Sequence, residues 1–221
     1  MSDWRIRVAG DAAVTVEFES RIDPVINARA VALAVGIRAA RYPGVRDVVP
    51  SYSAVAVYFD PLRTDFDRLW GALEQAAATG VEAARPAREV VVGVRYGGAA
   101  GPDLDEVADF AGCSTDDVIR RHTAPGYRVY MVGFLAGFPY LGTVDPRIAM
   151  PRRSSPRLSV PAGSVGIAGS QTGIYPTTAP GGWRLIGIAL VDPFDAGREP
   201  PCLFCPGDTV RFEAVSMEAG R

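Results

Sequence analysis

The sequence contains no lysine, so all 23 of its basic residues are arginine. A lysine amine is needed in a P-loop, in Schiff-base catalysis and for the attachment of biotin or lipoate. The absence of lysine excludes all of these from this chain. If the protein uses a nucleotide, either a partner chain or an arginine-based site must hold the phosphates.

Histidine and cysteine are also scarce. His122 is the only histidine, so a serine or cysteine triad would depend entirely on that residue as its base. Of the three cysteines, only Cys202 and Cys205 have the spacing of metal ligands, and a closed zinc site needs four ligands. We therefore expect reduced thiols and no metal site in this chain.

The sequence has neither a strong excess of one charge nor a long apolar run. Its formal net charge is -2, which offers no basic surface to a nucleic acid. Apolar runs such as residues 90–94 are too short to span a bilayer, and no basic segment followed by an apolar stretch stands at the N-terminus. We expect a cytoplasmic protein that binds neither nucleic acid nor membrane.

The first part of the chain has the pattern of a small α+β domain. Alternating residues predict strands over Trp4–Val8 and Ala13–Phe18, and Asp23 followed by Pro24 predicts the start of a helix. Two more strands and a second helix, capped by Thr64, complete the predicted order ββαββα. This order predicts one sheet with helices packed against it.

The second part has a different texture. Residues 81–88 are rich in alanine, proline and charged residues and show no hydrophobic periodicity. They therefore predict a domain boundary, with one domain over 1–84 and another over 85–221. A strand and two short helices follow, the helices capped by Asp103 and Ser114. Short strands separated by glycine and proline then predict a closed or nearly closed β-barrel.

His122 lies at the end of the second short helix. As a general base or proton relay it would have a pKa near the working pH. Alternatively, it bonds the last carbonyls of its helix and is favoured there by the helix dipole. We take His122 as the candidate catalytic residue.

Glycine is concentrated in residues 161–176, where polar side chains stand between the glycines. Such glycines would let backbone N–H groups approach a ligand closely, although the pattern is neither a P-loop nor a dinucleotide fingerprint. The alternative is a set of tight barrel turns that only glycine fits. The candidate binding residues of this segment are Ser164, Gly166, Gly169, Gln171, Thr172 and Tyr175.

An aromatic block and a group of arginines precede this segment. Rings in the block would either wall a pocket or fill a core. The guanidinium groups suit carboxylate or phosphate, with a solvated loop as the alternative. The candidate binding residues here are Tyr130, Phe138, Tyr140, Arg152 and Arg153.

Several motifs occur together and in a defined order. The most specific are His122-Thr-Ala-Pro125, Gly137-Phe-Pro-Tyr-Leu-Gly142, Pro161-Ala-Gly-Ser-Val-Gly-Ile-Ala-Gly169, Gln171-Thr-Gly-Ile-Tyr-Pro176 and Gly181-Gly-Trp183. With them the chain resembles, over nearly its whole length, the family of the B-type 5-oxoprolinase subunits. This family is also called allophanate hydrolase subunit 1 and includes the sporulation-kinase inhibitor KipI. Ala136 departs from the family pattern, which usually has proline there.

The resemblance implies a small α+β N-terminal domain and a cyclophilin-like β-barrel. It also implies a complex with a homologous C-type subunit and an A-type subunit, in which 5-oxoproline is opened to glutamate at the expense of ATP. ATP, with Mg²⁺, would be bound together with the partner subunit, and the chain would be inactive alone. Two alternatives within the family are an allophanate hydrolase subunit acting in urea breakdown and a non-catalytic inhibitor of a histidine kinase.

Overall fold

The computed structural model describes residues 3–79 and 87–215. The chain divides into two compact units, Met1–Ala87 and Arg88–Arg221, and each is described by itself. The predicted boundary between residues 84 and 85 lies outside the described residues. No helix in the described ranges is both long enough and apolar enough to cross a membrane.

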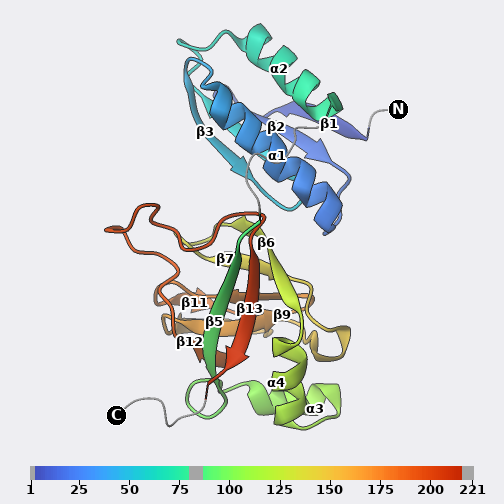
Figure 1. Cartoon of the computed structure of the whole chain (residues 1–221), viewed down its shortest axis with the longest axis vertical. Helices are drawn as coiled ribbons and strands as arrows, with labels where there is room; N and C mark the ends of the chain where they lie inside the picture. The colour runs from blue at the N-terminus through green and yellow to red at the C-terminus, as the bar shows by residue number, and fades with distance from the viewer. Residues whose placement is uncertain (1–2, 80–86, 216–221) are drawn as a thin grey trace. The chain divides into compact units, whose positions relative to one another are not determined.

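The first unit has the predicted order ββαββα. Its elements are β1 (Trp4–Val8), β2 (Ala13–Phe18), α1 (Pro24–Ala40), β3 (Val45–Pro50), β4 (Ala54–Phe59) and α2 (Phe66–Thr79). The four strands form an antiparallel sheet in the order β1-β2-β4-β3, and both helices pack on one face of it (Figure 1). The mixed α and β class predicted from the sequence is confirmed for this unit.

Alternation along the strands decides which face the helices cover. Val14 and Val16 of β2 and Val55 and Val57 of β4 are fully buried. Their neighbours point to the opposite face, where Glu17 is more exposed. A sheet of this pattern buries one apolar face and leaves the other in water.

The two helix starts of this unit were predicted with unequal success. The Asp23 carboxylate caps α1 as predicted, accepting hydrogen bonds from the N–H groups of Val25 at 2.8 Å and Ile26 at 3.1 Å. The predicted cap at Thr64 is wrong. The Asp65 carboxylate accepts the N–H of Arg68 at 3.0 Å, because α2 begins one residue later than the sequence pattern indicated.

The second unit is a closed barrel of seven strands, which confirms the predicted barrel. Its elements are β5 (Glu89–Tyr96), α3 (Leu104–Ala111), α4 (Thr115–Thr123), β6 (Gly126–Val132), β7 (Pro139–Gly142), η1 (Pro146–Ile148), β8 (Arg157–Val160), β9 (Ser164–Ala168), β10 (Gln171–Ile174), β11 (Ala179–Gly181), β12 (Arg184–Ala189) and β13 (Thr209–Ala214). The barrel order is β10-β7-β6-β13-β5-β12-β9, and β9 pairs with β10 to close it. Strands β8 and β11 form a separate ribbon.

Apolar side chains fill the barrel. Val92, Val129, Leu141, Ile167 and Phe212 are at most 1% exposed. Helices α3 and α4 lie together at one end of the barrel and add their own buried side chains to the same core (Figure 1). A barrel filled in this way has no room for a ligand inside, so a binding site must lie on its outer surface or rim.

His122, on α4, takes part in a chain of hydrogen bonds within this core. Its side chain is fully buried and its ring stacks on Phe212, with the centroids 4.6 Å apart. The Thr172 hydroxyl donates its single hydrogen to the carbonyl of Gly166 at 2.9 Å, so it must accept from His122 Nε2–H, also at 2.9 Å. His122 Nδ1 then accepts from the Tyr96 hydroxyl at 2.7 Å.

These contacts describe a neutral histidine. Burial lowers its pKa from 6.5 to about 3, because the core disfavours the charged ring. The side chain joins α4 to strands β5 and β10 and leaves neither ring nitrogen without a partner. Exchange of a proton with a substrate stays a prediction, and these contacts do not provide a path for it.

Asp103 is a buried carboxylate at the start of α3. It stands at the predicted N-cap position, but its side chain makes no capping hydrogen bond. Its two oxygens instead accept from the Arg157 guanidinium at 2.6 and 2.9 Å, from Arg153 at 3.2 Å and from the N–H of Leu185 at 2.7 Å. The carboxylate is 1% exposed, so these donors replace its water. Asp103 therefore ties α3, the segment 153–157 and β12 together.

We expect the exchange Asp103→Asn to destabilise the barrel. It would leave Arg157 without its paired carboxylate and Arg153 with only the more distant, half-exposed Glu106. The cost should be about 2–3 kcal/mol, below that of a fully buried pair because both guanidinium groups keep some contact with water. Urea unfolding would measure the loss. Asp60→Asn is the matched control, because Asp60 pairs with the mostly exposed Arg46 and its loss should destabilise the protein much less. Equal losses in the two variants would contradict the assignment of Asp103.

We also expect the buried His122 to make stability depend on pH. Its folded pKa lies below its unfolded value, so the unfolded chain binds the extra proton and stability falls as the pH drops from 6.5 towards 3. The slope attributable to this group approaches about 1.4 kcal/mol per pH unit. Because His122 is the only histidine, His122→Gln should flatten the curve between pH 4.5 and 6.5, as urea unfolding at several pH values would reveal. Parallel curves for the two proteins would show that His122 does not titrate in this way.

Candidate functional site

A cavity of about 210 Å³ on the barrel unit is walled by aromatic rings. It brings together four of the residues predicted from the sequence: Phe138, Tyr140, Arg152 and Tyr175. Its full lining is Phe134, Phe138, Tyr140, Arg152, Pro156, Tyr175, Pro180, Gly181, Gly182 and Trp183. We refer to it as the aromatic cavity.

Phe138 is the centre of the aromatic wall. Its ring meets those of Tyr140, Tyr175 and Trp183 edge to face, with centroids 4.9, 5.2 and 5.4 Å apart. This is the geometry that aromatic pairs prefer, and each contact restricts the rotation of its neighbours. The wall is therefore a rigid surface that suits a flat, partly apolar molecule.

Arg152 supplies the positive charge of the cavity. Its guanidinium lies over the Trp183 ring, 5.6 Å from the centroid. Within the described ranges no carboxylate lies within ion-pair distance of it, in contrast to Arg153 next to it. A guanidinium held by an aromatic face and free of a counter-charge is suited to binding a carboxylate or phosphate.

Two tyrosine hydroxyls complete the polar groups of the cavity. Burial raises the pKa of both Tyr140 and Tyr175, so each stays protonated at neutral pH. A protonated hydroxyl can donate a hydrogen bond to a carbonyl oxygen. The lining of the cavity thus combines a cation and two protonated tyrosines with an apolar surface.

Phe134 stands at the rim in a costly conformation. Its φ of 69° is in the left-handed region, which is unusual for a bulky residue, and its side chain is 60% exposed. The loop is held by the N–H of Gly133, which donates to Phe138 O at 3.1 Å, and by that of Phe138, which donates to Leu135 O at 3.1 Å. Strain of this kind is often found beside functional sites, and it is consistent with a role for the cavity.

One side of the aromatic cavity is fixed by the Asp103 cluster, which consists of Asp103, Arg153, Arg157 and the N–H of Leu185. Arg153, which was predicted to bind a ligand, lies in this cluster instead, and its side chain is committed to Asp103. Its backbone N–H also donates to Gly182 O at 2.8 Å. The lining residues Arg152 and Gly182 are thereby held in place by a residue that does not itself line the cavity.

The other predicted site residues do not line the aromatic cavity. Tyr130, His122, Thr172, Ser164 and Gly166 are buried in the barrel unit. A Cβ on Gly166 would lie 2.9 Å from Trp183 Cβ, so close packing of the strands requires glycine there.

The last two candidates lie where β9 turns into β10. Gly169 has a φ of 59°, and its N–H donates to Met150 O at 2.9 Å. Gln171 follows as the first residue of β10. Ligand binding by these residues stays a prediction, although Gly169 has the left-handed backbone of a tight turn and Gly166 is a closely packed residue within β9.

Sequence reasoning missed Trp183 and the two glycines before it as site residues. The Gly-Gly-Trp motif was a signal that could have found them. A Cβ on Gly181 would lie 2.2 Å from the Tyr175 hydroxyl, so the backbone can pass that ring only with glycine at this position.

Known proteins of this type provide an independent comparison. The family model described as "Carboxyltransferase domain, subdomain C and D" matches residues 4–204. A Bacillus subtilis (strain 168) protein named as the B subunit of 5-oxoprolinase is 39% identical over 96% of this chain and 93% of its own length. Its namesake from Escherichia coli O157:H7 is 40% identical over 96% of each chain.

A solved structure agrees. The protein in the crystal structure of TTHA0988 has 39% sequence identity to this chain, and the two structures superpose with a TM-score of 0.84. The match covers 98% of this chain but only 41% of that protein. The motifs, the barrel and these full-length similarities lead to one conclusion: the chain belongs to the carboxyltransferase family of subdomains C and D, among the relatives named as B subunits of 5-oxoprolinase.

Proposed function

We propose that this chain is the B-type subunit of an ATP-dependent 5-oxoprolinase, which opens 5-oxoproline to glutamate, and that the aromatic cavity contacts the substrate. The observation that carries the proposal is the guanidinium of Arg152 over Trp183, in a chain about 40% identical to relatives named as B subunits of 5-oxoprolinase. The alternative activity within the family is hydrolysis of allophanate, and the experiments below distinguish it from opening of 5-oxoproline.

The substrate's shape and charge are consistent with the cavity. 5-Oxoproline is a nearly flat five-membered lactam that carries one carboxylate. Its ring would lie against the aromatic wall formed around Phe138, and its carboxylate would pair with Arg152. Tyr140 and Tyr175 also line the cavity, and we propose that a hydroxyl group of this pair donates to the lactam carbonyl.

Binding alone does not open a lactam, and the remaining chemistry must come from elsewhere. The chain has no lysine and no P-loop to hold the phosphates of ATP. The described residues include no group of three or more histidine, cysteine, aspartate or glutamate side chains that could hold a metal ion. We infer that ATP and Mg²⁺ are bound together with a homologous C-type subunit, and that an A-type subunit completes ring opening.

Activity should therefore depend on the partners. We expect the purified chain to release no glutamate from 5-oxoproline, and the chain mixed with C-type and A-type subunits, ATP and Mg²⁺ to release it. The assay would follow glutamate and ADP together, with allophanate as a parallel substrate. Turnover by the isolated chain would contradict the proposal, and turnover of allophanate alone would assign the second family activity.

Arg152→Gln tests the cavity itself. Loss of a charge-assisted hydrogen bond to a carboxylate costs about 1.5–3 kcal/mol, so the KM for 5-oxoproline in the assembled enzyme should rise about 10-fold to 100-fold with little change in kcat. Arg68→Gln on α2 is the control, since it removes an exposed guanidinium outside the cavity. A KM unchanged by Arg152→Gln would remove the aromatic cavity from the substrate site.

A further inference from the structure

A second and larger cavity lies beside the end of α4. Its volume is about 560 Å³, and none of its lining residues belongs to the aromatic cavity. Its charged lining consists of Arg120, Arg121, Arg147 and Asp145. Three arginines and a single aspartate therefore line an otherwise mainly apolar hollow, which we refer to as the arginine cavity.

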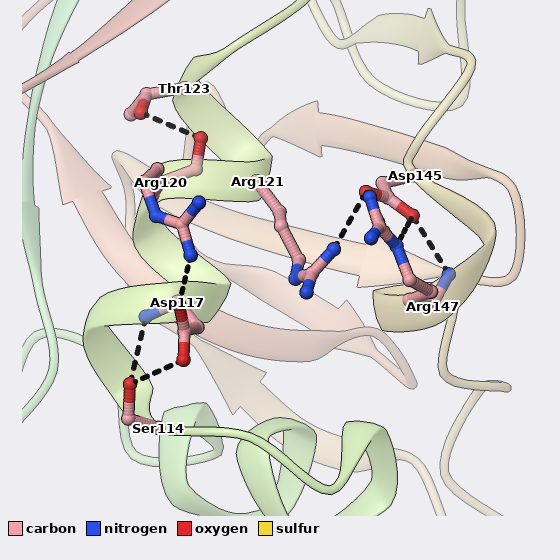
Figure 2. A network of polar contacts seen from close by, with 7 residues as sticks. All are labelled: Ser114, Asp117, Arg120, Arg121, Thr123, Asp145 and Arg147. Atoms are coloured by element: carbon pink, nitrogen blue, oxygen red, sulfur yellow. Dashed lines mark hydrogen bonds and ion pairs between the residues drawn. The ribbon is translucent and has the colours of Figure 1, made fainter.

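The single carboxylate is occupied almost entirely by one of the three arginines. Asp145 accepts from Arg147 Nε at 3.0 Å, from Arg147 Nη2 at 2.6 Å and from the Arg147 N–H at 3.0 Å. Figure 2 shows that the guanidinium groups of Arg121 and Arg147 both reach Asp145. The hydrogen bonds from Arg147 hold the pKa of Asp145 far below its usual range, so this group is a fixed negative charge.

The positive charge of Arg121 is only weakly balanced by negative charge nearby. Its side chain is only 20% exposed, and its one contact with a carboxylate among the described residues is the 3.4 Å approach of Nη1 to Asp145. Its Nε is buried with no hydrogen-bond partner in the same part of the chain. A mostly buried cation with unused donors is costly unless a further acceptor is supplied.

Arg120 is directed along the helix. Its guanidinium pairs with Asp117, one turn earlier, and that pair is largely exposed (Figure 2). An exposed pair of this kind is weak, so Arg120 can turn towards the cavity at little cost. The cavity therefore has one arginine anchored on Asp145, one with an unused donor and one in an exposed ion pair.

The carbonyl end of α4 does not cancel this positive charge. A helix C-terminus carries partial negative charge on its unpaired carbonyls. Here the Thr123 hydroxyl donates to Ile119 O at 2.9 Å, the Ala124 N–H donates to Arg120 O at 3.0 Å, and the Tyr127 hydroxyl donates to His122 O at 2.9 Å. With these carbonyls occupied, the arginines are not needed to satisfy them.

We propose that the arginine cavity is an anion-binding site, which takes the phosphate or carboxylate group of a small ligand against Arg121 and Arg147, with the apolar part of the ligand on Ala124, Pro125 and Pro146. Guanidinium groups bind both oxyanions in the same forked geometry. Binding at this site can be measured on the isolated chain, and the measurement does not require the proposed reaction.

Calorimetric titration of the full-length chain tests the proposal with three probes at low ionic strength: inorganic pyrophosphate, metal-free ATP and citrate. Binding of the first two but not of citrate would assign a phosphate ligand, and binding of citrate alone would assign a carboxylate ligand. No binding of any probe at millimolar concentration would overturn the proposal.

Variants then locate the binding. We expect Arg121→Gln and Arg147→Gln each to lower the affinity for the probe by about tenfold, which is the effect of losing one charge-assisted contact. Arg46→Gln, whose side chain is as exposed as that of Arg147, is the control and should bind normally. An equal loss in the control would mean general attraction of anions and would overturn the site.

Asp145→Asn provides a test of opposite sign. Asparagine removes the competing negative charge but keeps one oxygen that can still accept from Arg147, so the probe should bind about threefold to tenfold more tightly. If the arginines serve only to balance Asp145, the same variant would gain nothing. Weaker or unchanged binding in Asp145→Asn, with the fold intact by circular dichroism, would contradict the proposal.

Discussion

The buried carboxylate of Asp103 is the constraint on which the candidate site depends. A charge removed from water must be compensated locally, and here two arginines and one backbone N–H do so. These donors come from segments that are distant in sequence, so satisfying one carboxylate fixes the positions of all of them. Arg152 and Gly182 of the aromatic cavity are adjacent to, or bonded to, residues of this cluster.

The absence of lysine gives the arginines several distinct tasks. Arg157 binds Asp103 through two parallel hydrogen bonds, which a single ammonium group could not reproduce. Arg152 lies over an indole ring, where a planar cation is favoured. Arg121 and Arg147 share one aspartate beside a hollow. The same residue type thus maintains the fold at one place and supplies the charge of the two proposed binding sites at two others.

The buried histidine shows how a polar residue can belong to a core. His122, Tyr96 and Thr172 donate and accept in one direction, ending at the carbonyl of Gly166, so that each polar atom in the chain has a partner. Such a network is stable only while the ring is neutral, which the surrounding aromatic side chains ensure. Its position joins α4 to the barrel and so also sets where the end of that helix, with Arg120 and Arg121, is held.

The sequence by itself determined the features that depend on near neighbours. The order of elements in the first unit, the caps at Asp23 and Ser114, and the closed barrel all follow from periodicity, turn residues and local hydrogen bonds. The motifs likewise identified the family. Even here, the sequence pattern placed the cap of α2 one residue early, at Thr64, because the neighbouring Asp65 is also a residue type that caps helices.

Only the tertiary structure decided which side chains meet. The sequence placed Arg152 and Arg153 side by side as equal candidates, yet one lines a cavity and the other binds a buried carboxylate. It offered His122 as a proton carrier, whereas the closed barrel encloses that ring among aromatic side chains. Exposure, pairing and pKa depend on strand register and on donors contributed by distant segments, and no local pattern in the sequence encodes these.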